Sequence, residues 1–463
     1  MAIFLAVIGI SPEVRATQPL ETFIQAARMT GFDAREQTAT IEQRKWEKEA
    51  ALGRLTPALS ARGVYTRNQY EAEIPAGPVS PVAITITPRN QLDALFQLDV
   101  PLIDLANYYR YGQARHLVNA AEAQRELSRS DSDRVVARSY YTFVGAAALV
   151  DAAERSLKSA EDNLAYVSTR FAAGVVSELD RERAVANVER AKQERADAEF
   201  VRTMSARNLE TASGITPTPV TEYPVDDLRP EAPLAEWLRG RDTPADRVQV
   251  HLGRAANSAK KAAKSALLPT LSANAQERIS NATGFSGHTS AYTLQAVLSW
   301  RADYGAYASA EAQASAADVQ KVRAERSRRG TEDGIFDAHE RVRTGIAKSA
   351  SARAQSAAAS RAEALAIARY QAGALTQLDV TQAQRDAFQA QAARIQADAD
   401  LAYARVLLRV MAGKPPRVPE SAPPASSVSL PPSVPVSASP ALPSPPSPPP
   451  SPSPSLAPSP PAP

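Results

Sequence analysis

The sequence predicts a mainly α-helical chain built from two tandem copies of one unit, a strand pair followed by a long helical hairpin, with the strands contributing to a membrane β-barrel. Three observations predict this fold: blocks of residues recur at a fixed spacing, apolar residues in the long segments recur about every 3.5 residues, and two short segments alternate apolar and polar residues. One chain has too few strands to close a barrel, so the fold also implies an oligomer.

The repeat defines a first copy over residues 20–215 and a second over 245–413. Asp104 recurs as Asp303 and Gly214 as Gly413, and both pairs are 199 residues apart (303 − 104 and 413 − 214). More than 110 residues therefore run in parallel without an insertion (214 − 104 = 110). Loops change length easily, so this fixed spacing indicates that the length itself is constrained.

Strand pairs are expected over residues 56–103 and 269–302. Apolar residues alternate from Leu92 to Val100 and from Tyr292 to Trp300, runs of 9 residues each (100 − 92 + 1), and a tilted membrane strand needs about 9 to 11. For each run alone, a half-buried strand of a soluble sandwich is the alternative. At the 199 offset the two apolar phases differ by one residue, for which a β-bulge is the candidate explanation.

The first copy is also longer upstream of Asp104. Pro57 matches Pro269 at an offset of 212 (269 − 57), which is 13 more than 199 and indicates a hairpin loop of variable length. Two strands per copy give four per chain, and three chains would give 12.

Helical hairpins are expected over residues 105–214 and 304–412, with turns near 173–177 and 372–377. From Phe143 to Phe171, nine apolar or small residues recur at a mean spacing of 28/8, or 3.5, which is the coiled-coil period. A helix from 105 to 170 would be about 100 Å long at 1.5 Å per residue. A further helix is expected before each strand pair, near 33–55 and 245–268.

The remaining segments are expected to lack regular structure. Residues 216–244 are expected to form an irregular linker between the copies, and the family resemblance given below implies an equatorial position for it. The last 50 residues, 414–463, contain 21 of the 36 prolines, so an extended, disordered spacer is expected there.

Residues 1–19 resemble a truncated signal segment, with an apolar run and a small-residue site but no basic start; a short buried strand or helix is the alternative. No other run approaches the roughly 18 to 20 apolar residues of a membrane helix, so a membrane crossing is expected only from strands.

The composition excludes several classes of function. The 53 basic and 50 acidic residues leave a net charge of +3, too balanced to suggest nucleic acid. The chain has no Cys and only four scattered His residues, so the sequence predicts no metal site and no cofactor. No set of nucleophile, base and orienting group is visible, so no enzyme and no catalytic residue are predicted.

The two hairpin turns carry a shared motif, in which Arg-[Phe/Tyr]-x-x-Gly is followed by Leu-Asp. It occurs at 170–180 and at 369–379. Together with the strand-ending Asp104 and Asp303, these turns resemble the TolC-like outer-membrane factor family, also called outer membrane efflux proteins, over residues 20–413.

The resemblance implies a homotrimer in the outer membrane of a Gram-negative bacterium, with a 12-strand barrel in lipid and a 12-helix tunnel across the periplasm. It implies a passive exit duct of a tripartite efflux or type I secretion system, in which no chemistry is performed. The implied partners are a periplasmic adaptor and an inner-membrane RND or ABC transporter.

The resemblance also implies roles for the tip residues. Those expected to contact the adaptor are Arg170, Phe171, Gly174, Val175, Arg369, Tyr370, Gly373 and Ala374. Those expected at the periplasmic aperture or its latch are Asp180, Tyr370, Asp379 and Gln382. The chain departs from the family in two places: Leu375 stands where a latch arginine is expected, and Gln382 stands where a second carboxylate is expected.

Each role has a simpler alternative. Asp180 and Asp379 would also suit the first turn of a helix, and Arg170 and Arg369 the last turn, because each charge complements the helix dipole there. Phe171 and Tyr370 would also suit hairpin packing.

For the whole chain, the alternatives are a periplasmic coiled-coil adaptor or a structural scaffold without channel activity. An adaptor normally has one hairpin and Gly- and Val-rich flanking domains, and a scaffold does not need recurring strands.

Overall fold

The computed structural model describes residues 18–78, 81, 83–220, 223, 225–301 and 303–416. The chain divides into two compact units, Met1–Glu420 and Ser421–Pro463, and every described residue belongs to the first. Nearly all of the expected signal segment and most of the expected C-terminal spacer lie outside the described residues.

The elements follow one another in two similar series. The first series is α1 (Leu20–Thr30), α2 (Phe32–Gly53), β1 (Ala58–Arg67), β2 (Ala72–Ile74), β3 (Ile84–Thr87), β4 (Asn90–Ile103), α3 (Leu105–Ala172) and α4 (Glu178–Ser213). The second is α5 (Leu234–Leu238), α6 (Pro244–Ser265), β5 (Thr270–Ser280), the short 3₁₀ helix η1 (Gly284–Ser286), β6 (Ser290–Ser299), α7 (Tyr304–Gln371) and α8 (Gln377–Met411).

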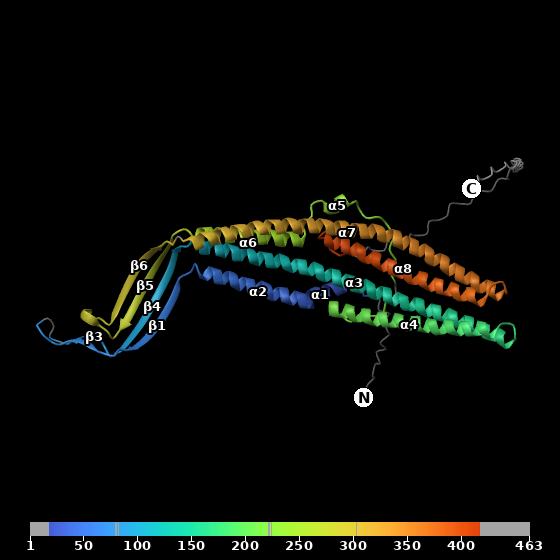
Figure 1. The fold of residues 1–463 in the computed structure, drawn as a ribbon, viewed down its shortest axis with the longest axis horizontal. Coiled ribbons are helices and arrows are strands. Elements are labelled where there is room, and N and C mark those ends of the chain that lie inside the picture. The colour runs from blue at the N-terminus through green and yellow to red at the C-terminus, as the bar shows by residue number, and fades with distance from the viewer. Residues whose placement is uncertain are drawn as a thin grey trace, which may run out of the picture. The chain divides into compact units, whose positions relative to one another are not determined.

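The long helices α3 and α7 organise this unit. Each has 68 residues and begins at an aspartate, Asp104 or Asp303, whose side chain accepts a hydrogen bond from a backbone N–H of the first turn. α3 packs against α2, α4, α6 and α8, and α7 packs against α6 and α8. The sheet lies at one end of these helices and both hairpin turns lie at the other (Figure 1).

Small side chains dominate the helix seams. Ala153, Ala160, Ala184, Ala191 and Ala198 are all buried between α3 and α4 or their neighbours, and such small residues allow helix axes to approach closely. Larger apolar clusters occur where α1 packs on α3 and where the linker packs on α7 and α8. None of the described helices is long and apolar enough to cross a membrane.

Strands from both copies form one antiparallel sheet in the order β1-β4-β5-β6. Leu98 pairs with Leu59 in the first copy, and Leu298 pairs with Leu271 in the second. The strands therefore correspond at an offset of 200 (298 − 98), whereas the helices correspond at 199. The extra residue is accommodated by a register shift between Pro101 and Ile103, so the bulge expected from the sequence is confirmed.

The sheet has one apolar and one polar face. Residues paired directly across antiparallel strands share a face, so the strand register shows on which face of the sheet each side chain lies. The first face is mostly apolar and largely exposed; it includes Leu59, Leu92, Phe96, Leu98, Ile279, Tyr292, Leu294 and Leu298. Glu277 and Ser290 also lie on this face, where the Ser290 hydroxyl donates to the Glu277 carboxylate. The second face is mostly polar; it includes Asp93, Gln97, Asp99, Asn274, Gln276, Arg278, Thr293 and Gln295.

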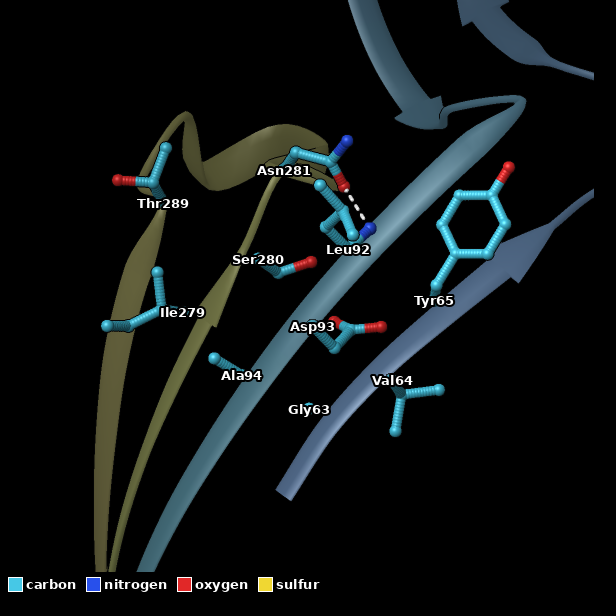
Figure 2. A pocket seen from close by; sticks show the side chains of 10 residues that line it. All are labelled: Gly63, Val64, Tyr65, Leu92, Asp93, Ala94, Ile279, Ser280, Asn281 and Thr289. Carbon is cyan, nitrogen blue, oxygen red and sulfur yellow. Dashed lines mark hydrogen bonds between the residues drawn. The ribbon is translucent and has the colours of Figure 1, made fainter. Parts of the chain in front are cut away.

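The sheet ends in a shallow hollow beside the turn that follows β5, lined by residues that include Gly63, Leu92 and Ile279 (Figure 2). Asn281 holds this turn against β4: its Oδ1 accepts from the Leu92 N–H at 2.8 Å, and its Nδ2 donates to the Asn90 carbonyl at 2.8 Å. The hollow is open, and we assign no function to it.

Four elements differ from the sequence prediction. α1 is a separate helix that buries Leu20, Phe23 and Ile24, although the prediction began the first helix near residue 33. α5 interrupts the linker that was expected to be irregular, because Trp237 is buried there. β2 and β3 form a second, two-stranded sheet within the longer first-copy loop.

Candidate functional site at the hairpin tips

The two hairpin tips pack against each other within one chain. Val167 and Ala184 from the first hairpin form an apolar cluster with Tyr370 and Val380 from the second. The structure therefore brings the two copies of the turn motif, which are 199 residues apart in the sequence, to one end of the molecule (Figure 1).

The turn glycines provide a left-handed backbone conformation. φ is 72° at Gly174 and 77° at Gly373, where residues with a Cβ are strained. A Cβ at either position would meet no atom within 4 Å, so the requirement is conformational and not steric. The Val175 N–H donates to the Arg170 carbonyl at 2.9 Å, the closing bond of this type of helix C-cap.

The tip aspartates stabilise the start of the return helices. The Asp180 N–H donates to Ser177 Oγ at 3.2 Å, and the Asp379 N–H donates to Thr376 Oγ1 at 3.4 Å. Asp379 Oδ2 in turn accepts from the Thr376 N–H at 2.9 Å, which completes a capping box. The hydrogen bonds from Thr376 lower the pKa of Asp379. Within one chain, this geometry indicates that both carboxylates stabilise the first turn of a helix. A role of these carboxylates at an aperture is a proposal.

Tyr370 fills the space between the hairpins. It is 5% exposed, and its ring meets the Tyr166 ring edge-on at a centroid distance of 6.0 Å. Its hydroxyl has no hydrogen-bond partner in the described part of the chain. Burial, and secondarily the Asp180 charge, raise the pKa of Tyr370. Leu375, at the place of the expected latch arginine, packs against the same cluster.

The aromatic and basic tip residues pair locally. The Arg170 guanidinium lies 5.6 Å from the centroid of the Tyr166 ring and donates Nη1 to its hydroxyl at 3.2 Å. Arg181 lies over the Phe171 ring at 5.2 Å. Through these contacts Arg170 and Phe171 both contribute to hairpin packing. For Phe171, packing is the alternative role that the sequence analysis named.

The other predicted residues lie at the surface. Val175, Arg369, Gly373 and Ala374 are exposed at the turns. Gln382 is also exposed, one helical turn beyond Asp379, where its Nε2 donates to Asp386 Oδ1 at 2.9 Å. The turns therefore present a surface of small, apolar and basic groups.

Sequence reasoning missed the polar contacts between the hairpins. Asn187 on α4 donates to Gln384 on α8 at 2.8 Å, and both side chains are buried. A signal was present, because Asn187 lies within the series of buried small and apolar residues that contains Ala184, Val188 and Ala191. No group of three or more metal-ligand side chains occurs among the described residues.

Solved structures share this fold over most of the chain. A membrane protein from Pseudomonas aeruginosa has a TM-score of 0.74 and 20% identity, covering 85% of this chain and 93% of its own. The CmeC outer membrane channel of Campylobacter jejuni has a TM-score of 0.73 and 16% identity, and the match covers 89% of this chain and 93% of CmeC. The open-state MtrE outer membrane channel of Neisseria gonorrhoeae has a TM-score of 0.70 and 19% identity, and the match covers 86% of this chain and 90% of MtrE. These likenesses establish the fold.

One known protein family matches part of the sequence. Residues 24–215 match the family described as outer membrane efflux protein. No curated protein sequence matches the chain. The resemblance found at the hairpin turns is therefore confirmed: residues 24–215 match the outer membrane efflux protein family, and the chain has the fold of solved outer-membrane channels.

Proposed function

We propose that this chain is one protomer of a homotrimeric outer-membrane efflux channel, a passive exit duct that receives substrate from a periplasmic adaptor and an inner-membrane transporter of the RND or ABC kind. The observation that carries the proposal is the two-faced sheet at the end of two long helical hairpins. The family match and the outer-membrane channels of the same fold support it.

The apolar face of the sheet suits contact with lipid. It continues across all four strands, and most of its large side chains are exposed in the single chain. A soluble protein seldom exposes an apolar surface of this extent. Among the strands that the structure describes, β1 and β6 each have one edge without a partner, and such edges are not tolerated in lipid. Three copies would supply 12 strands (3 × 4) and pair every edge.

The polar face suits a water-filled interior. Arg278 donates to Asp93 Oδ1 at 2.7 Å, and Asn274 donates Nδ2 to Asp99 Oδ1 at 2.6 Å. Charged and amide side chains of this kind favour water over hydrocarbon. Alternation of lipid-facing and water-facing residues is the pattern of membrane barrels.

The tips suit the adaptor-facing end. They lie at the opposite end of the helices from the sheet (Figure 1) and expose Val175, Arg369 and Ala374. A barrel in the outer membrane would therefore place the tips deep in the periplasm, since each long helix is about 100 Å long at 1.5 Å per residue.

A pair of arginine substitutions tests the assignment of the two faces. Leu294 lies in the middle of β6 on the apolar face and is 71% exposed, and its neighbour Gln295 lies on the polar face. Leu294→Arg should lower the free energy of unfolding from a bilayer by about 2–4 kcal/mol, because it places a charge in hydrocarbon. Gln295→Arg should change it little. Denaturant titration of the protein in lipid vesicles measures both.

Equal effects of the two substitutions would contradict the assignment of the lipid face. Membrane fractionation with crosslinking provides the second test: a heat-sensitive trimer in the outer membrane is expected, and a soluble monomer would overturn the channel proposal.

A further inference from the structure

Side chains from all four helices of the tip half form one continuous series of hydrogen bonds. Asn187 on α4 donates Nδ2 to Oε1 of Gln384 on α8 at 2.8 Å, and Gln384 donates Nε2 to Oγ of Ser159 on α3 at 2.9 Å. Ser159 donates its hydroxyl to Oε1 of Glu363 on α7 at 2.8 Å. At the other end, Arg190 Nη2 donates to Oδ1 of Asn187 at 2.6 Å.

Every donor in this series points the same way, from the Arg190 guanidinium to the Glu363 carboxylate. A guanidinium only donates and a carboxylate only accepts, so the two ends fix the orientation of the amides between them. Turning either amide around would place two donors or two acceptors face to face. Hydrogen bonds aligned in one direction also polarise and strengthen one another.

The series crosses a seam in which small and apolar side chains pack beside it. Asn187 and Gln384 are each 3% exposed, and the nearby packing is made by Ala160, Val188 and Ala191. Leaving one such buried polar group without a partner costs about 1–3 kcal/mol. Burial also raises the pKa of Glu363, an effect that the Ser159 hydroxyl opposes.

Alanine-rich seams define helix register poorly, because successive turns present nearly the same small surface. Sliding one hairpin along the other by one turn, about 5.4 Å, would keep most alanine contacts. The same movement would separate Asn187 from Gln384 and Gln384 from Ser159. Buried polar residues at such seams are known to specify register at some cost in stability.

We propose that the series from Arg190 to Glu363 is a register lock, which fixes the axial position of the α7/α8 hairpin against the α3/α4 hairpin within one protomer. Asn187 lies ten residues from Ser177, the N-cap of the return helix α4 (187 − 177), or about 15 Å along the helix. Beyond the lock, the last turns of the two hairpins contact each other through the apolar cluster that contains Val167 and Tyr370. The consequence of the lock for opening rests on the proposed channel function, but the lock itself does not.

Spin-label distances test the lock, and a chain without cysteine allows labels at chosen sites. The pair Ala173→Cys with Ala372→Cys reports on the tips. The pair Arg155→Cys with Ala354→Cys reports on the sheet side of the lock. Measurements use the full-length protein diluted with unlabelled protein, so that distances within one chain dominate.

The informative variant is the double substitution Asn187→Leu with Gln384→Leu, which removes both amides together and leaves a packed apolar pair. We expect the tip distance distribution to broaden about twofold or gain a second peak about one helical turn away. The pair beyond the lock should broaden less, and the melting temperature should stay close to that of the parent. Gln389→Leu, an exposed glutamine on the same helix, is the matched control and should change neither distance.

A tip distribution as narrow in the double variant as in the parent would overturn the lock. If the double variant does not fold, Glu363→Gln removes only the terminal charge and should still broaden the tip distribution; an unchanged distribution then overturns the proposal. If the parent conducts no ions in planar bilayers and the distances nevertheless respond, the channel proposal fails and the lock stands.

Discussion

The Tyr370 hydroxyl lies in the apolar contact between the two hairpin tips and has no partner among the described residues. The ring is well packed, whereas the hydroxyl gains nothing within the single chain. Packing and latching therefore make different demands on this residue: packing needs only the ring, and a latch needs the oxygen.

Substitutions at Tyr370 separate these demands. Tyr370→Phe should change the free energy of unfolding by less than about 0.5 kcal/mol, because no hydrogen bond is lost within the chain. Tyr370→Ala should cost about 3–5 kcal/mol, because it leaves a cavity between the tips. Denaturant unfolding of the purified protein measures both. A loss above about 1 kcal/mol for Tyr370→Phe would show that the hydroxyl is hydrogen-bonded in the assembled protein, as a latch requires.

The tip glycines show what the sequence can predict at this scale. Glycine is the residue that most readily adopts a positive φ, and both Gly174 and Gly373, at the same place in the repeated turn motif, have positive φ. The partners of Tyr370 were not predictable, because they depend on how the two hairpins meet and not on either turn alone.

At the scale of single elements, the capping box makes the start of α8 sensitive to acid. The pKa of Asp379 is lowered from 3.8 by its hydrogen bonds with Thr376. A carboxylate with a depressed pKa stabilises the folded state above its ordinary pKa, and this stabilisation is lost as the pH falls through the depressed value. The first turn of α8 should therefore loosen below about pH 4.

Hydrogen exchange of the backbone amides at the start of α8 checks this expectation. Asp379→Asn should expose these amides at neutral pH and remove the acid-dependent change. Asp386→Asn, an exposed carboxylate two turns further along α8, should leave both properties as in the parent. Persistence of the acid-dependent change in Asp379→Asn would assign it to another group.

The long helices were predictable because their pattern extends over many turns. The 3.5-residue period and the 199 offset predicted hairpins that the structure places at α3, α4, α7 and α8, and α3 and α7 have equal lengths of 68 residues. α1 was missed because its eleven residues are too few to establish a period. The contacts of Asn187 with Gln384 were missed because they lie between the copies, at an offset of 197 (384 − 187), and an internal repeat detects only what both copies share.

On the scale of the whole first unit, arginines connect the shorter segments to the long helices. Arg405 on α8 is 5% exposed and bonds Asp226 at 2.6 and 2.9 Å and Glu231 at 2.6 Å, which holds the linker in place. A related contact occurs in both copies: Arg28 pairs with Asp133 on α3, and Arg241 pairs with Glu332 on α7. The two acids lie 199 residues apart (332 − 133). The acidic partner of the arginine therefore occupies the same position on the long helix in both copies.

Arg405→Met should lower the free energy of unfolding by about 3–5 kcal/mol, because it leaves two buried carboxylates without their partner. Arg341→Met is the matched control; Arg341 pairs with Asp337 on the exposed surface of α7, and such pairs contribute about 1 kcal/mol or less. Thermal and denaturant unfolding compare the two. Similar losses for both variants would show that the linker contact is not a main source of stability.

The bulge between Pro101 and Ile103 shows where this architecture can vary in length. One extra residue in β4 is absorbed within a few residues, and the following helix begins at its usual aspartate. One extra residue inside a hairpin helix would rotate every later side chain by about 100° and turn the seam away from its partner. A longer tunnel would therefore have to arise in steps of whole heptads, about 10 Å each, added to outgoing and returning helices of both copies at once. Duplication of a matched block is a plausible route to such a change, whereas single insertions would accumulate only in the strands and their loops.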